Sequence, residues 1–171
     1  MTVTINGNGT ITPTSAVQPT GSVLQVVSGF KDDSVSFSTL WTAREISSDL
    51  RAVITPTATS SKILVACHLS VSQASNIACF QLTRTIGGTK TNIFEHTDSS
   101  TPYQGCANTW FEDDPYITHI SFSFLDSPNT TSEITYSPDL GGCGNTVYIN
   151  KIYNSTTHLG TSSTIATEIA G

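Results

Sequence analysis

Charged residues are scarce in this 171-residue chain, and their scarcity excludes one large class of partner. Lysine and arginine together number 7 against 13 aspartates and glutamates, giving a formal net charge of −6, and only 12% of residues are charged. Binding to nucleic acid depends on clustered basic side chains that displace counterions from phosphates. The sequence has no such cluster, so we expect no nucleic-acid partner.

The sequence also lacks long apolar runs and cysteines at the spacing of known metal or redox motifs. No apolar run approaches about 18 residues, so no segment is predicted to insert into a membrane. The first ten residues lack the basic and apolar regions of a secretory signal. The sequence therefore predicts a product that stays in the cytosol or leaves it inside a larger particle. None of the four cysteines lies in a Cys-x-x-Cys arrangement, which favours free thiols over zinc ligands or disulfides. They are Cys67, Cys79, Cys106 and Cys143.

Hydroxyl side chains take the place of the missing charges. The 23 serines and 28 threonines make up 51 of 171 residues, and threonine favours strands while serine favours turns. Helical periodicity is nearly absent, with one short turn expected within residues 42–50. Apolar–polar alternation recurs instead in short segments separated by Gly, Pro, Asn and Ser. The expected strands are residues 23–27, 35–38, 50–54, 62–71, 77–86, 90–94, 117–125, 133–136, 145–153 and 163–169.

The clearest alternation runs from Lys62 to Val71. One face carries Ile63, Val65, Cys67, Leu69 and Val71, and the other carries Lys62, His68 and Ser70. Cys67 is thus predicted in the core, and His68 and Ser70 on the solvent side. Gly87-Gly88 predicts a hairpin turn. The stretch SFSFLDSPNTTSEITYSP, residues 121–138, predicts a second hairpin, because two alternating segments flank four turn-forming residues.

These segments predict an all-β fold: a single jelly-roll-like β-sandwich of about ten strands over residues 22–171. Residues 1–21 form an extended N-terminal arm with too few large apolar residues to bury a face alone. Val3, Ile5, Ile11 and Val17 are spaced so that the arm could add a strand to the sheet edge of a partner. A frayed terminus explains the same composition equally well.

No constellation predicts catalysis, a metal or a cofactor. The histidines are His68, His96, His119 and His158, and the Gly-x-Ser-x-Gly motif of many hydrolases is absent. The acidic stretches 95–98 and 112–114 match neither EF-hand nor zinc spacing. Solvated loops explain them best, and calcium or magnesium at 112–114 is the metal alternative.

One stretch, residues 101–116, is a candidate binding loop. Aromatic side chains stack on sugar C–H surfaces, while amides and carboxylates bond to sugar hydroxyls. The candidate glycan-binding or receptor-binding residues are Tyr103, Asn108, Trp110, Asp113, Asp114 and Tyr116. The competing interpretation, which we favour at this point, is that Trp110 and Phe111 pack under the loop or at a subunit contact.

Several stretches together resemble a family of phage virion proteins, the tail-fibre and related surface domains of cyanophage-like aquatic phages. They are GSVLQVVS, AVITPTATSSKILVACHLSVS, SFSFLDSPNTTSEITYSP, NTVYINK and STIATEIAG. The resemblance covers most of residues 22–171 and is weaker over 95–116. It implies a non-enzymatic virion component, made in the bacterial host cytoplasm and assembled as a homotrimer. The abundance of apolar strands, more than one thin sandwich can hide, also favours a trimer.

Three functions follow as hypotheses. The first is a structural virion protein, a tail-fibre head, knob or capsid decoration, which residues 1–21 anchor to other virion proteins. The second is a host-attachment module that binds cell-surface glycan through residues 101–116. A cell-wall hydrolase is the third, and the sequence supports it least.

Overall fold

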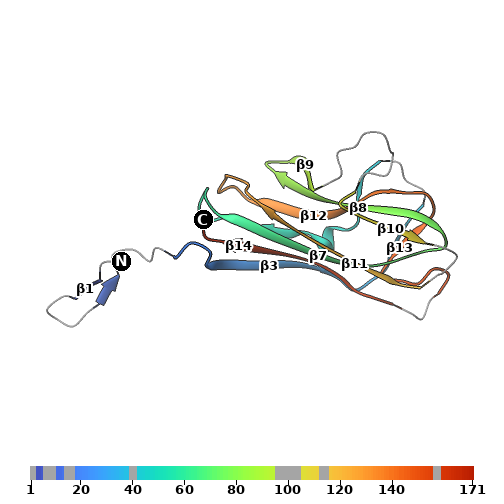
Figure 1. The fold of residues 1–171 in the computed structure, drawn as a ribbon, viewed down its shortest axis with the longest axis horizontal. Helices are drawn as coiled ribbons and strands as arrows, with labels where there is room; N and C mark the ends of the chain where they lie inside the picture. Colours follow the sequence, from blue (N-terminus) through green and yellow to red (C-terminus); the bar gives the residue numbers. More distant parts are fainter. Residues whose placement is uncertain are drawn as a thin grey trace.

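Two antiparallel sheets of six strands each pack face to face in the computed structural model (Figure 1). This arrangement confirms the predicted all-β sandwich. The structure describes residues 3–5, 11–13, 18–38, 42–94, 105–111, 116–155 and 159–171. Within these ranges no helix is long and apolar enough to cross a membrane.

We name each sheet after its central strand. The β7 sheet contains β3 (Val23–Lys31), β14 (Ser162–Ile169), β7 (Lys62–Gln73), β11 (Thr118–Asp126), β13 (Val147–Ile149) and β4 (Val35–Phe37). Strand β7 pairs with β14 and then β13 along its length, and β11 also pairs with it; β3 lies beyond β14.

The β8 sheet contains β9 (Thr89–Phe94), β10 (Ala107–Phe111), β8 (Asn76–Ile86), β12 (Ile134–Cys143), β6 (Ala52–Ile54) and β5 (Arg44–Glu45). Strand β12 pairs with β8, β6 and β5, and β8 also pairs with β9 and β10. A single turn of 3-10 helix, η1 (Ser48–Leu50), lies in the stretch where a short helical turn was expected. Its backbone approaches β3 so closely that a Cβ on Gly29 would lie 2.5 Å from the carbonyl carbon of Leu50.

Alternation along β7 builds the core as predicted. Ile63, Val65, Cys67, Leu69 and Val71 are all buried, and His68 is exposed. Ser70 is an exception to the predicted pattern, because it is buried although it lies on the opposite face from the core residues. Two clusters fill the space between the sheets, one around Phe80 and Leu69, the other around Tyr136 and Val65.

The turn between β8 and β9 confirms the Gly87-Gly88 prediction. Both glycines have positive φ, 55° and 81°, which is the requirement of a two-residue turn that follows the twist of a hairpin. Residue types with a β-carbon rarely adopt this conformation.

The predicted hairpin over residues 121–138 is wrong. Its two strands exist, as β11 and β12, but β11 pairs with β7 and β12 pairs with β8, so the connection crosses from one sheet to the other. Period-2 alternation specifies a strand and its buried face, but it carries no information about the partner strand.

Strands β10 and β12 differ from the sequence prediction in extent. Ala107–Phe111 was expected to lie in a loop and instead forms β10, paired with β8. Strand β12 continues past Pro138 to Cys143, with a bulge between Leu140 and Gly142. Pro138 pairs with Leu82 on β8 and falls between the segments of β12 that pair with β6 and with β5, so its missing N–H interrupts neither of those two ladders.

The N-terminal arm contains a hairpin. Strands β1 (Val3–Ile5) and β2 (Ile11–Pro13) pair with each other in antiparallel register. Figure 1 shows this hairpin outside the sandwich. Val17 lies outside the described residues.

Candidate functional site

The outer faces of the two sheets differ in chemistry, and we consider each as a candidate site. On the β8 sheet the outer face is largely polar, because Gln81, Thr83 and Thr85 on β8 pair with Asp139, Ser137 and Thr135 on β12. Lys90 on β9 pairs with Thr85, and Glu45 on β5 pairs with Asp139. These residues form cross-strand rows on one surface.

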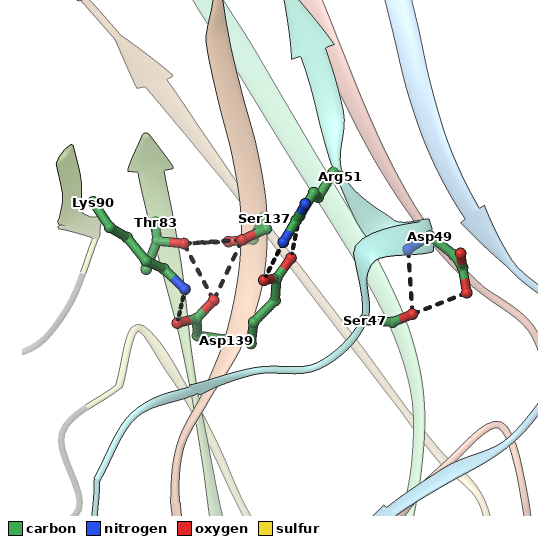
Figure 2. Close-up of polar contacts among 8 residues, drawn as sticks. Ser47, Asp49, Arg51, Thr83, Lys90, Ser137 and Asp139 are labelled. Atoms are coloured by element: carbon green, nitrogen blue, oxygen red, sulfur yellow. Dashed lines mark hydrogen bonds and ion pairs between the residues drawn. The ribbon is translucent and has the colours of Figure 1, made fainter. Parts of the chain in front are cut away.

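Asp139 is the centre of the polar network on this face. Its carboxylate is buried, and Lys90 Nζ lies 2.6 Å from Oδ2. The hydroxyls of Thr83 and Ser137 lie 3.2 and 3.3 Å from Oδ1. Figure 2 shows Lys90, Thr83 and Ser137 arranged around this carboxylate. Since both oxygens are bonded and the charge is paired, Asp139 is best explained as a structural residue that joins β8, β9 and β12.

Glu45, beside Asp139 in the register, has its own cation. Arg51 Nε and Nη2 donate to Oε1 and Oε2 of Glu45 at 2.5 and 2.7 Å and so form a bidentate ion pair. The hydrogen bond from Arg51 lowers the pKa of Glu45 below its ordinary value, with smaller contributions from the charges of Arg51 and Lys90. Each of the two neighbouring carboxylates is thus paired with a cation, an arrangement that does not suit general acid catalysis.

Two of the predicted glycan residues lie on the same strand. Asn108 and Trp110 lie on β10 and pair with Cys79 and Ile77, so both belong to the outer face of the β8 sheet. Trp110 is 64% exposed, whereas the adjacent Phe111 is buried in the core. Phe111 therefore packs inward and Trp110 faces outward, because alternation on a strand sends neighbours to opposite faces. A subunit contact at Trp110 stays a prediction.

The structure describes one of the other predicted glycan residues, Tyr116. Tyr116 is exposed and precedes β11, a strand of the opposite sheet. Tyr103, Asp113 and Asp114 lie outside the described residues, as does the alternative metal stretch 112–114. Over the described ranges, no three histidine, cysteine or acidic side chains lie close enough together to hold a metal ion.

The β7 sheet has an apolar outer face. Six large apolar side chains on this face are between 38% and 61% exposed, and together we call them the apolar patch. They are Val23, Val26, Phe30, Leu64, Leu125 and Ile165. The register places Leu64 beside Leu125 and separates this pair from Val26 by Thr167, because the four residues are successive partners across β3, β14, β7 and β11.

Carboxylates are excluded from the apolar patch. The four strands that carry it contain two acidic residues, Asp126 and Glu168, and both side chains are buried. The acidic charge of the chain is therefore located elsewhere. Alternation could have located each member of the patch on the polar face of its strand, but their contiguity depends on the strand pairing.

Two stacked histidines lie at one end of the patch. The rings of His68 and His119 are 5.2 Å apart with an interplanar angle of 18°. His68 Nδ1 lies 3.0 Å from Ser121 Oγ, and His119 Nδ1 lies 3.2 Å from Ser70 Oγ. Ser70 Oγ also donates to the carbonyl of Thr161, and this enclosure explains its burial.

This histidine pair does not form a hydrolase triad. A triad needs a carboxylate that orients the histidine, and the side-chain contacts of both rings within the described residues are to serine hydroxyls and to each other. His96 and His158 lie outside those residues. The arrangement thus supplies aromatic and polar surface at the end of the patch.

Comparison with known proteins gives similarity at the level of solved structures. No protein-family model and no curated protein sequence matches the chain. The chain is similar to the crystal structure of the infectious bursal disease virus VP2 subviral particle, with 11% identity and a TM-score of 0.45, covering 94% of this chain and 37% of that chain. The T=1 particles derived from infectious bursal virus give 11% identity, a TM-score of 0.45, and coverage of 94% and 41%.

A third similar structure is that of the infectious bursal disease virus Gx strain, with 10% identity, a TM-score of 0.43, and coverage of 94% and 43%. The chain spans less than half the length of these viral proteins. At 10–11% identity, this similarity concerns the fold alone.

Proposed function

We propose that this chain is a structural component of a phage virion, a surface-exposed head or knob that assembles as a homotrimer through the β7 sheet. The apolar patch is the observation that carries the proposal. Exposed apolar area is unfavourable in water, and the β7 face exposes six large apolar side chains whereas the β8 face exposes Val53 and Trp110 among the described residues. The patch therefore needs a partner, and the resemblance of the sequence to phage surface domains indicates the context.

The polar β8 face suits the outside of such an assembly. Its charged groups are paired and its hydroxyls are extensively bonded, as in the network around Asp139. With the β7 sheet turned inward, the exposed residues of this sheet, such as Lys90 and Trp110, would face solvent, while Thr83, Ser137 and Asp139 are buried. No residue of either face has a catalytic role in the proposal, and none is assigned to a cofactor.

Particle imaging tests the location. Purified virions should contain the chain, and electron microscopy with a label attached to it should locate it on the particle surface, either on the capsid or on the tail. Light scattering of the isolated chain should give three times the 18.2 kDa chain mass. Absence of the chain from purified particles would overturn the proposal.

Host attachment through glycan is a second candidate function, favoured by the exposure of Trp110. An exposed tryptophan next to Asn108 on the same strand face offers an aromatic surface and an amide to a sugar ring. On a glycan array, Trp110→Ala should abolish binding, and Asn108→Ala should weaken it. Val53→Ser, which alters an exposed apolar residue elsewhere on the same sheet, is the matched control. An array with no bound glycan would contradict this second function.

A further inference from the structure

Phe30 protrudes at one side of the apolar patch. It lies on β3, next to β14, where its cross-strand partner is Ser163. Its side chain is 56% exposed, although a phenyl group gains much free energy when it is buried. A small partner beside it leaves the ring without a neighbour to cover it. Phe30 is thus a protruding apolar group at the β3 side of the sheet.

A hollow lies on the same face; it begins at Ser163, the cross-strand partner of Phe30, and extends over β7 to β11. Its volume is about 330 Å³, more than twice the roughly 150 Å³ that holds benzene in an engineered apolar cavity. Small side chains on β7, β11 and β14 form much of its lining, with larger ones at its rim. The lining includes Ala66, His68, Ser121, Ser123, Ser163 and Ile165. The hollow therefore has the size and the mixed apolar and aromatic lining that a phenyl ring requires.

We propose that each copy of the chain inserts Phe30 into the hollow of a neighbouring copy, so that three copies close into a ring. This inference rests on the proposed assembly through the β7 sheet and names its contact. The protruding group lies on β3 and the hollow extends from β14 to β11, so a ring would join the β3 side of one copy to the hollow of the next. Contacts of this kind form a closed ring when the rotation between copies permits it.

The exposed area supports a second copy as the occupant. Six side chains that each expose roughly 100 Å² give about 600 Å², the upper limit of the largest apolar patch on a typical monomer. A standard interface buries about 800 Å² on each partner, so the patch with its polar surroundings provides most of what a stable contact needs.

Charge supports the same occupant. Two copies of a chain with a net charge of −6 repel each other, and repulsion is smallest where no carboxylate faces the contact. The strands of the patch have their carboxylates, Asp126 and Glu168, turned inward. This face is therefore one on which copies of this acidic chain can approach closely.

Disulfide trapping tests the contact directly. In the full chain, the double variant Phe30→Cys/Ser123→Cys should form covalent trimers under mild oxidation, visible on a non-reducing gel. Mixing the two single variants should give covalent dimers, since each donates one half of the contact. The F30C variant alone should remain uncrosslinked, as should the wild type, whose cysteines are mostly buried. Covalent dimers without trimers from the double variant, or efficient crosslinking of F30C to itself, would overturn the ring, because either result means a two-fold contact.

Solution measurements supply a second readout that is independent of disulfide chemistry. Phe30→Ser should raise the concentration at which trimers dissociate by at least about tenfold, as expected for a central interface residue. Ser121→Phe should do the same by filling the hollow, whereas Val53→Ser on the other sheet should leave dissociation unchanged. Unaltered trimers in both variants would overturn the contact. If the chain is found on virions but the Phe30 contact is not detected, this inference fails and the proposed function stands. If the chain is absent from virions, the proposed function fails whatever the crosslinks show.

Discussion

Buried polar side chains are matched to partners that lie far away in the sequence. Asp126, at the end of β11, accepts from Arg84 Nη1 at 2.9 Å through both oxygens and from the Tyr136 hydroxyl at 2.7 Å. Burial, and then the hydrogen bond to Asp126, raise the pKa of Tyr136 above its ordinary value. Because Arg84 and Tyr136 belong to the β8 sheet, these contacts join the two sheets at one carboxylate.

Thiol reactivity tests the burial of individual residues. Burial raises the pKa of Cys67 to about 12 and that of Cys106 to about 11, so neither thiol is ionised to a useful extent at pH 8. Cys67 is buried and Cys106 is partly exposed. In native protein we expect slow alkylation at Cys106 and none at Cys67, which should react only after unfolding. Mass spectrometry of the alkylated peptides gives the measurement.

A Cys106→Ser variant is the control for this experiment, since its native form should take up almost no reagent. Rapid alkylation of Cys67 in the native wild type would mean that the register of β7 is shifted by one residue, which would move its side chain to the other face.

At the scale of elements, Glu168 attaches a loop to the end of the β7 sheet. This buried carboxylate on β14 accepts hydrogen bonds from Gln25 Nε2, from the Thr57 amide and hydroxyl, and from Ser61 Oγ, at 2.6 to 2.7 Å. Burial alone would raise the pKa of Glu168. The hydrogen bonds from Ser61, Gln25 and Thr57 outweigh this effect and hold it below 4.5.

The lowered pKa predicts acid sensitivity. A carboxyl whose pKa is lower in the folded state than in the unfolded state stabilises the fold above the unfolded pKa, and this stabilisation is lost as the pH falls through the folded value. Glu168→Gln should reduce the free energy of unfolding at pH 7 by about 1–3 kcal/mol, because its amide nitrogen cannot accept from these donors.

Urea unfolding between pH 7 and pH 3 measures this effect. The difference between wild type and Glu168→Gln should be constant near neutral pH and should shrink as the pH falls below about 4.5. Glu45 and Asp33 also have lowered pKa values, but both remain in the variant and so do not contribute to the difference. A difference that stays constant down to pH 3 would contradict the assignment.

For the whole molecule, we predict that the arm and the head are separable. The Gly21 amide donates to the carbonyl of Ala170 at 2.8 Å, and the Ala170 amide donates to the carbonyl of Ser22 at 2.9 Å, so residues retained after deletion of 2–20 keep these bonds. The hairpin of β1 and β2 is too small to be stable alone, which favours docking on a neighbouring virion protein. Deletion should change the melting temperature by less than about 3 °C, yet abolish incorporation into particles.

Calorimetry measures the melting temperature of the truncated chain, and analysis of the proteins in purified particles measures its incorporation. If the truncated chain still enters virions, the anchor lies on the head. If the deletion unfolds the head, residues 1–21 belong to its core, and the boundary at Gly21 is wrong.

Much of the sandwich follows from local sequence. Ile63, Val65, Cys67, Leu69 and Val71 alternate with more polar residues, so the buried face of β7 can be predicted without knowing its partners. The Gly87-Gly88 turn is equally local, because its positive φ angles are a property of two residues. These features depend on the local sequence and on burial against an apolar core, whichever residues make up that core.

Strand pairing depends on contacts between residues distant in the sequence, and the candidate surfaces follow from it. The hairpin predicted over 121–138 was wrong because its two strands pair in different sheets, and Asp126 at the end of β11 binds Arg84 and Tyr136 across the sandwich. Trp110 became an outward residue only through the pairing of β10 with β8. Val26, Leu64 and Leu125 are separate apolar residues in the sequence, and they form one patch because β3, β14, β7 and β11 lie side by side. Alternation assigns each side chain to a face, whereas the free energy that selects neighbouring strands comes from packing between segments far apart in the chain.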